Sequence, residues 1–359
     1  MLRSAGASLR RRPASALAFP GQSFERPAGA TMALSRSRRS WVVVVISRAV
    51  SMCERRAEAI TSDSNTISSN SVSDTGLRVF PVPQVGISLS NSDGNVLSKN
   101  ITNGNKTCGI LIDGSSGNML KQNTADFNED ASASGIRLTN ANQNKLIGNT
   151  TNFNTIDGIS FAGSSGNVVS GNTSSANLVG FDLTNATNNT FLGNTASGNF
   201  DAGFGASNMS NNNTFMKNKV NNTNTVTGSG SVGIEVSGNS NVVKGNMVIG
   251  TLGIGIVVSG QMATVSDNIV KNNQGDGIQL SQLTSSLISG NVIMNNDGDG
   301  IDVFSNSSGN TISGNMAMGD GANTGGFDLF DASIGMGTAG TANTWLNNKS
   351  QTRSPAKLL

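Results

Sequence analysis

The sequence contains no histidine and no tyrosine. Without histidine there is no Ser-His-Asp or Cys-His arrangement, no histidine-ligated zinc and no imidazole base. Without tyrosine there is no phenolic acid or base. These absences weigh against an enzyme and leave carboxylates as the main groups that could carry chemistry.

Cysteine, arginine and long apolar runs are also scarce. Two cysteines, Cys53 and Cys108, cannot form a disulfide framework. Beyond residue 60 the only arginines are Arg78, Arg137 and Arg353. The apolar run at residues 41–46 is far shorter than the roughly 20 residues that span a bilayer. We therefore expect no transmembrane segment, and without a groove-reading motif we expect no nucleic acid partner.

Charge divides the chain into two unequal parts. Residues 1–60 hold 11 arginines and 3 glutamates, a net charge of +8, and the remaining residues hold 13 basic and 19 acidic groups, a net charge of −6. The first segment is interpreted as a disordered stretch, a misassigned translation start, an export signal from Met32 with a twin-arginine-like Arg38-Arg39, or a basic arm. The domain boundaries that follow are 1–60, 61–349 for the folded body, and a tail at 350–359 that we expect to be unstructured.

A glycine followed by two apolar residues at alternating positions recurs about every 24 residues. Apolar residues two apart are the period of a strand with one buried face. A fixed period of this length indicates one structural unit stacked many times. The repeat glycines are Gly86, Gly109, Gly135, Gly158, Gly180, Gly203, Gly233, Gly255, Gly277, Gly300 and Gly326.

Asparagine marks the bends of each unit. A second short strand follows about nine residues after the first, in the form Asn-x-apolar-x-x-Asn, and a third asparagine column lies five residues beyond the closing one. Asparagine tolerates the left-handed backbone of sharp turns, and its amide can bond along a stack of identical amides. The pattern predicts an all-β, single-stranded parallel β-helix of about 11–12 rungs of 22–26 residues, with three short strands per rung.

This repeat resembles that of the right-handed parallel β-helix proteins in the pectate-lyase-like superfamily, most closely the NosD-type proteins of bacteria. The resemblance covers roughly residues 64 to 349 and implies a right-handed coil and an extracellular or periplasmic location. It says little about activity, because the same scaffold carries lyases, hydrolases, epimerases and adhesins. Lyases of the superfamily use calcium-bridging aspartates with a nearby basic residue.

The candidate site is a group of aspartates near the C-terminus: Asp276, Asp297, Asp299, Asp302 and Asp328. Residues between the two apolar positions of a unit should point to solvent, so Asp302 and Asp328 are expected on successive rungs about 5 Å apart. Such like charges raise one another's pKa or attract Ca²⁺, and the spacing also suits a retaining glycosidase pair. Solvated charges with no further role remain an alternative.

Two functions follow. The first is a non-catalytic exported β-helix protein that presents a polar face to carbohydrate or a cell-surface component. The alternative is a polysaccharide lyase or hydrolase that acts through the aspartate cluster. No catalytic residue and no metal ligand is assigned. We expect no cofactor, with Ca²⁺ as the one option that the aspartates leave open. The sequence does not indicate the oligomeric state.

Overall fold

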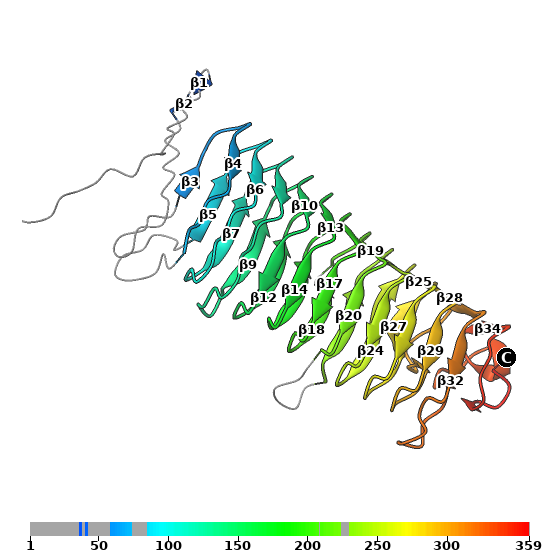
Figure 1. Ribbon diagram of the computed structural model, residues 1–359. Coiled ribbons are helices and arrows are strands. Elements are labelled where there is room, and N and C mark those ends of the chain that lie inside the picture. The colour runs from blue at the N-terminus through cyan, green and yellow to red at the C-terminus, as the bar shows by residue number, and fades with distance from the viewer. Residues whose placement is uncertain are drawn as a thin grey trace, which may run out of the picture.

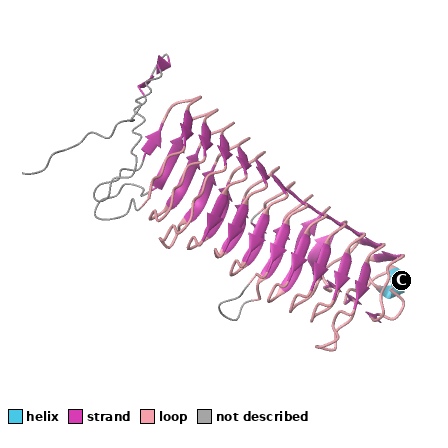
Figure 2. Cartoon of the chain, viewed as in Figure 1, coloured by secondary structure: helices cyan, strands magenta, loops and turns pink. Residues whose placement is uncertain are grey.

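The computed structural model describes residues 36–37, 40–41, 58–73, 85–207, 209–223 and 230–358. From residue 58 onward the described chain winds into one elongated coil of parallel strands, as predicted (Figure 1). Most of the Arg-rich segment lies outside the described residues. Those of its residues that are described form the antiparallel pair β1 (Arg36–Ser37) and β2 (Ser40–Trp41) and the first strand of the coil, β3 (Glu58–Ile60). Figure 2 shows that the coil consists almost entirely of strands and turns.

Three parallel sheets run along the coil. The 13-stranded sheet contains β3 (Glu58–Ile60), β5 (Val85–Ser90), β7 (Cys108–Asp113), β9 (Ser134–Thr139), β12 (Asp157–Ala162), β15 (Val179–Thr184), β18 (Ala202–Ser207), β21 (Val232–Ser237), β24 (Ile254–Gln261), β27 (Ile278–Thr284), β30 (Ile301–Val303), β33 (Leu329–Asp331) and β35 (Arg353–Ser354). The 12-stranded sheet contains β4 (Thr66–Ser68), β6 (Val96–Ser98), β8 (Met119–Lys121), β10 (Lys145–Ile147), β13 (Val168–Ser170), β16 (Thr190–Leu192), β19 (Thr214–Met216), β22 (Val242–Lys244), β25 (Thr264–Ser266), β28 (Leu287–Ser289), β31 (Thr311–Ser313) and β34 (Thr344–Leu346). The 8-stranded sheet contains β11 (Thr150–Asn152), β14 (Thr173–Ser175), β17 (Thr195–Ser197), β20 (Lys219–Asn221), β23 (Met247–Ile249), β26 (Ile269–Lys271), β29 (Val292–Met294) and β32 (Met316–Met318).

The third strand of each rung is less regular than predicted. At the N-terminal end the place of the 8-stranded sheet is taken by single bridges, such as Ile101 with Thr124 and Thr124 with Thr150. The short 3-10 helix η1 (Thr338–Gly340) lies between β33 and β34 in the described chain.

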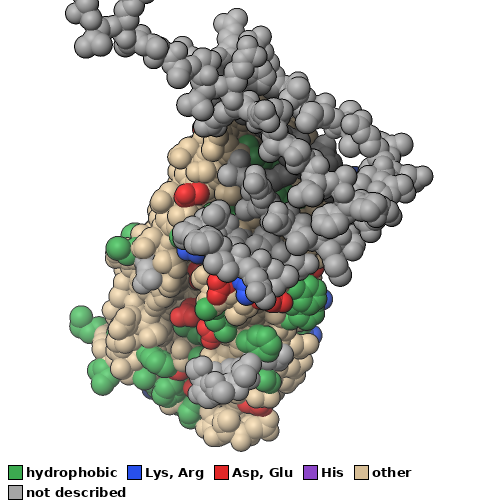
Figure 3. Space-filling view, turned by 90° about the vertical axis from the view of Figure 1, so that its left-hand side faces the viewer, with side chains coloured by type: hydrophobic (Ala, Val, Ile, Leu, Met, Phe, Trp, Pro, Cys, Tyr) green, Lys and Arg blue, Asp and Glu red, His purple; other side chains and the backbone are tan. Residues whose placement is uncertain are grey.

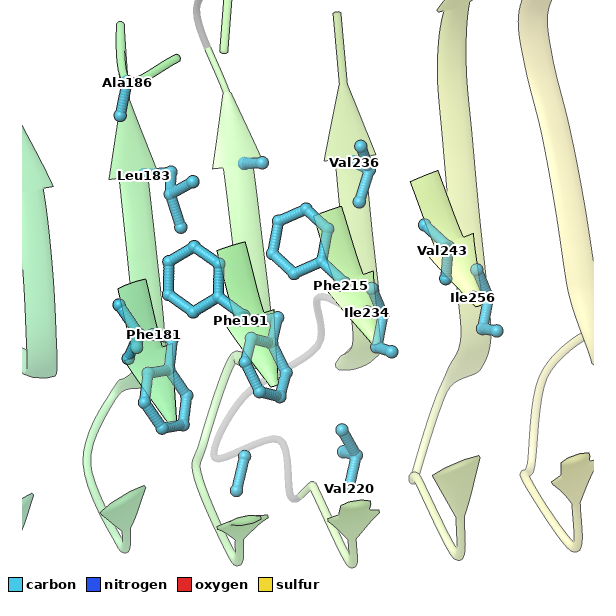
Figure 4. Packing of buried hydrophobic residues seen from close by; sticks show 14 of the residues in the cluster. Phe181, Leu183, Ala186, Phe191, Phe215, Val220, Ile234, Val236, Val243 and Ile256 are labelled. Atoms are coloured by element: carbon cyan, nitrogen blue, oxygen red, sulfur yellow. The ribbon is translucent and has the colours of Figure 1, made fainter. Parts of the chain in front are cut away.

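The core is a narrow column of apolar side chains, one set for each rung. The alternating positions predicted to be buried, such as Ile87 and Leu89, are fully buried. Aromatic rings stack along the axis in the middle of the column: Phe181 lies on Phe204 at 4.5 Å between centroids, and Phe191 on Phe215 at 5.2 Å (Figure 4). Each rung is thus completed by the rungs above and below it.

The repeat glycine is required by close packing. A Cβ at Gly158 would lie 1.7 Å from the Ser174 hydroxyl and 2.7 Å from the carbonyl oxygen of Gly180. The position therefore points inward at a corner where the neighbouring strand and turn meet it. No larger residue fits there without moving the backbone.

The asparagine columns form buried hydrogen-bonded ladders. The side-chain oxygen of Asn172 accepts bonds from the backbone and amide nitrogens of Asn149 at 2.8 and 2.9 Å. Its amide nitrogen donates to Asn194 Oδ1 at 3.0 Å and to the backbone oxygen of Leu146 at 2.9 Å. The predicted asparagine ladders are confirmed, and they satisfy polar groups that would otherwise be buried without partners.

The C-terminal residues differ from expectation. The tail expected to be unstructured beyond residue 350 belongs to the last turn of the coil, because β35 pairs with β33 and Leu358 is fully buried. Asp328 is also inside the coil and only 1% exposed. It accepts bonds from the backbone nitrogens of Asp320, Gln351 and Thr352 at 2.7 to 2.9 Å. The carboxylate thus satisfies backbone donors from the chain segments before and after β33 in the sequence.

Candidate functional site

Two columns of outward side chains run along the 13-stranded sheet. One column holds the residue before each repeat glycine, and the other holds the residue three positions later. In one rung the pair is Asp276, just before β27, and Gln279 on β27. In the next rung it is Asp299, just before β30, and Asp302 on β30, because Gln279 pairs with Asp302. Consecutive rungs therefore bring carboxylates from two positions of the repeat onto one patch.

Asp276, Asp299 and Asp302 form the acidic cluster. Each offers a carboxylate oxygen within 4.8 Å of the others. Asp276 accepts a bond from the backbone nitrogen of Asp299 at 2.8 Å and one from the Gln279 amide at 3.2 Å. Asp299 accepts the backbone N–H of Phe327. Asp302 is only 7% exposed, and its Oδ1 is buried without a hydrogen-bond partner among the described residues.

All three carboxyl groups are held toward their protonated forms. Burial raises the pKa of Asp302 to about 7, and the charges of Asp276 and Asp299 add to the effect. Burial also raises the pKa of Asp276 and of Asp299 above the ordinary range. A group of this kind can share a proton or bind a cation, because either relieves the repulsion between buried like charges.

Two of the five predicted site residues lie elsewhere. Asp297 is in the bend before β30, where it accepts a bond from the Asn323 amide at 2.7 Å. Asp328 was predicted to stack on Asp302, and this was wrong: Asp302 pairs with Phe330, and Asp328 occupies the inward position that glycine fills on earlier rungs. The expectation that Asp302 and Asp328 point to solvent was also wrong, since both are buried.

The corrected register brings an aromatic pair to the acidic cluster. Phe327 continues the column of Asp299, and Phe330 continues the column of Asp302. The two rings are partly exposed and stack nearly parallel, with 5.9 Å between centroids. This pair was not predicted, because the repeat glycine Gly326 places Phe327 opposite the core residue Ile301, whereas Leu329 occupies that position in the structure.

A second group of charged residues lies on the same sheet, nearer the N-terminus. Asp182 and Arg137 lie in one outward column on either side of Ser160, and Asp157 stands one position before its repeat glycine. Burial, with the charge of Asp182, raises the pKa of Asp157 to about 7, and burial raises that of Asp182. The sequence repeat places these residues in the outward columns, but the spacing of the repeat did not predict that their carboxyl groups are buried.

In the space-filling view of Figure 3, acidic side chains gather in the middle of the surface that the grey atoms leave visible. Hydrophobic side chains lie beside them.

The described part of the chain contains no helix long and apolar enough to span a membrane.

Comparison with protein families finds a match to the model described as "Right handed beta helix region" at residues 56–220 and 221–351. A comparison with curated proteins finds no match. Among solved structures, PfbA, a surface adhesin of Streptococcus pneumoniae, is 12% identical with a TM-score of 0.54, and the match covers 74% of this chain and 80% of that one. A double mutant of the periplasmic alginate epimerase AlgG is 14% identical with a TM-score of 0.52, covering 74% and 72%. At these identities the likeness concerns the fold.

Proposed function

The chain belongs to the right-handed β-helix family, and we propose that it is an exported protein that binds carbohydrate on the outer face of its 13-stranded sheet. The binding site consists of the acidic cluster, Gln279 and the Phe327–Phe330 pair. One observation carries the proposal: carboxylates on two successive rungs are continued, in the same two columns, by a stacked aromatic pair.

The chemistry of this patch suits a sugar. The flat C–H face of a pyranose ring packs on an aromatic ring, and its hydroxyl groups donate to carboxylates and amides. Carboxylates beside an apolar platform thus provide both orientation and contact area. Two proteins with a similar fold support the proposal: the alginate epimerase acts on a polysaccharide, and a periplasmic epimerase and a surface adhesin both lie outside the cytoplasm.

Binding is tested on a glycan array that includes neutral and uronate oligosaccharides, followed by calorimetry on the best ligand. We expect Phe330→Ala and Asp299→Asn to weaken binding at least tenfold. The matched control is Phe153→Ala, which disrupts a second exposed stacked pair, Phe127 with Phe153, at 4.9 Å. Equal loss in the control, or no loss in the site variants, would refute the proposed location.

A bound divalent cation would complete the same site. Asp276, Asp299 and Asp302 supply oxygen donors, which Ca²⁺ prefers, and the buried, unpartnered Oδ1 of Asp302 is available to it. In this form the site would bind an acidic sugar through the cation. Calcium titration monitored by calorimetry, with and without a uronate oligosaccharide, tests this version.

The second candidate is a polysaccharide hydrolase or lyase that uses the acidic cluster. It is favoured by Asp302, whose pKa of about 7 would let its carboxyl group donate a proton near neutral pH while a neighbour stays ionised. An assay for new reducing ends and unsaturated products on uronate polymers tests it. Turnover abolished by Asp302→Asn would establish the enzyme, and binding without turnover would establish the first function.

A further inference from the structure

The outward residues of the 8-stranded sheet change character halfway along the coil. On β11, β14 and β17 they are threonine, serine and asparagine. On the last four strands they are almost all apolar: β23 reads Met-Val-Ile, β26 Ile-Val-Lys, β29 Val-Ile-Met and β32 Met-Ala-Met, and in each the middle residue is buried. We call the outward residues of these four strands the methionine face.

The methionine face is continuous. Met247 pairs with Ile269, Ile269 with Val292, and Val292 with Met316, so one apolar column crosses four rungs. The parallel column beside it consists of Ile249, Lys271, Met294 and Met318, so one lysine stands among its apolar residues. Met247 is 37% exposed and belongs to the large hydrophobic residues on the surface.

Packing does not explain these side chains. The interior is filled by the middle residues Val248, Val270, Ile293 and Ala317, all fully buried. The first three strands of the same sheet have the same backbone pairing with polar residues outside. Apolar residues are therefore not needed at outward positions, and the packing of the coil does not explain why four successive strands carry them.

Lysines lie at both ends of this face, beside it and, in the case of Lys271, within it. Lys219 begins β20, Lys271 ends β26, and Lys349 forms a bridge with Met316. Lys217 lies in the turn before β20, and Lys244 ends β22 on the adjoining sheet. These five are all the lysines between residues 200 and 349.

Acidic side chains are sparse on these strands and in the turns before them, whereas the bends after β29 and β32 contain Asp297 and Asp320. Asp267, which pairs with Lys244 at 3.5 Å, is the only acid on strands β20 to β32 of this sheet and the turns that lead into them. Asp276, Asp299 and Asp302 belong instead to the face of the 13-stranded sheet. The C-terminal half of the coil is thus acidic on one face and apolar with basic edges on another.

We propose that the methionine face is a docking surface for an anionic lipid bilayer. Apolar side chains enter the headgroup region of a bilayer, and lysines at the edge of the patch meet the lipid phosphates. A second copy of the chain is a poorer occupant. The patch is about 15 Å by 10 Å, well below the roughly 800 Å² per partner of a stable interface.

The test is co-sedimentation of the full chain with two kinds of vesicle. One is phosphatidylcholine alone, and the other also contains about 30% of the anionic lipid phosphatidylglycerol. Residues 1–60 carry a net charge of +8, so binding to anionic vesicles alone would not locate the contact. The variants are therefore matched in charge. Lys219→Glu with Lys271→Glu changes the methionine face, and Lys121→Glu with Lys145→Glu makes the same change on the 12-stranded sheet.

We expect the first pair to lower the partition coefficient by about tenfold or more, since each lysine at such a surface contributes about a factor of five. The control pair should stay within about twofold of the wild type. The charge-neutral variant Met247→Ser, Met294→Ser, Met316→Ser should also weaken binding, and its loss should persist at high salt.

Three results would overturn the proposal: equal loss in both lysine pairs, unchanged binding in the serine variant, or no binding to anionic vesicles. A concentration-dependent dimer that the serine variant abolishes would also overturn it, because a second copy would then be the occupant. Circular dichroism of each variant confirms that the coil is retained.

Discussion

The 13-stranded and 8-stranded sheets share one interior but differ outside. Both are parallel ladders built around the same apolar column, with asparagine ladders at the bends. In the C-terminal half, one sheet bears Asp276, Asp299 and Asp302, while the other bears methionine, isoleucine and lysine. Because the interior alone satisfies packing and hydrogen bonding, the outward residues are free to specialise, and each face can be changed without disturbing the other.

The largest effect should come from a change that breaks the shared interior. Asn172→Ala removes the acceptor of two Asn149 bonds and the donor of two more in a buried ladder. We expect a loss of about 3 kcal/mol, because unsatisfied buried groups cost about 1–3 kcal/mol each. The control Thr173→Ala changes the next residue, which faces outward, and should shift stability by less than about 0.5 kcal/mol. Urea unfolding measures both, and similar losses would mean that interior and surface are not separable.

The next largest effect should be the response of thermal stability to calcium, which depends on the acidic face alone. If the acidic cluster binds Ca²⁺, millimolar calcium should raise the Tm by several degrees, because a ligand that binds only the folded state stabilises it. Asp302→Asn should abolish the shift, and Asp297→Asn, in the neighbouring bend, should retain it. Scanning calorimetry with calcium and with EDTA measures this. A wild-type Tm that is the same with calcium and with EDTA would show that the acidic cluster does not bind Ca²⁺.

Stability should also depend on pH through the acidic face. Asp302 has a folded-state pKa of about 7, above the unfolded value of about 4. The folded state therefore holds a proton that the unfolded state has lost, and this stability is complete below about pH 4 and disappears as the pH rises through 7. We expect the Tm to fall between pH 5 and pH 8, with a smaller fall in Asp302→Asn.

The control for the pH experiment lies on the side of the lysines. Asp267→Asn removes an exposed carboxylate that pairs with Lys244, and it is the matched control for the loss of one carboxylate from the surface. Asp157 and Asp320, with pKa values raised to about 7 and about 6, should account for the slope that remains in Asp302→Asn. A wild-type Tm that rises from pH 5 to pH 8 would contradict the prediction.

The smallest effect on stability is expected on the methionine face. Met294→Thr replaces a partly exposed residue with the type that occupies outward positions of β11 and β14. Thermal unfolding should change by about 0.5 kcal/mol or less, because surface substitutions away from special features rarely exceed that value. A loss of 2 kcal/mol or more would show that the methionines support the fold, and that contact with a partner is not needed to explain them.

Much of the fold could be predicted because the repeat specifies it many times over. The alternation of Ile87 and Leu89 gave the buried face of each strand, and the asparagine columns gave the bends. A misread unit in the middle of such a series is corrected by its neighbours. The last unit recognised in the sequence, which begins at Gly326, could be aligned with a preceding unit only. There the alignment of Asp328 failed: Asp302 pairs with Phe330, and β35 follows β33 in the sheet.

The site was only partly predictable. The sequence indicated an acidic group, and the structure brings three of its members, Asp276, Asp299 and Asp302, together, because residues one repeat apart lie on successive rungs. It could not indicate that Asp302 is buried, that Asp328 binds backbone nitrogens, or that Phe327 and Phe330 lie beside the carboxylates. Those facts depend on the local register and on the loops that cover each position.

The amino-acid sequence by itself determined the parallel coil, its apolar column and its asparagine ladders, since each is a short pattern repeated at a fixed period and stacked by nearest-neighbour contacts. Tertiary structure decided which carboxylates meet, which are buried and which outward positions join into one surface. These properties depend on pairing between rungs and on the closure of the last turn, where a shift of two residues replaced a predicted aspartate pair with an aspartate beside a phenylalanine.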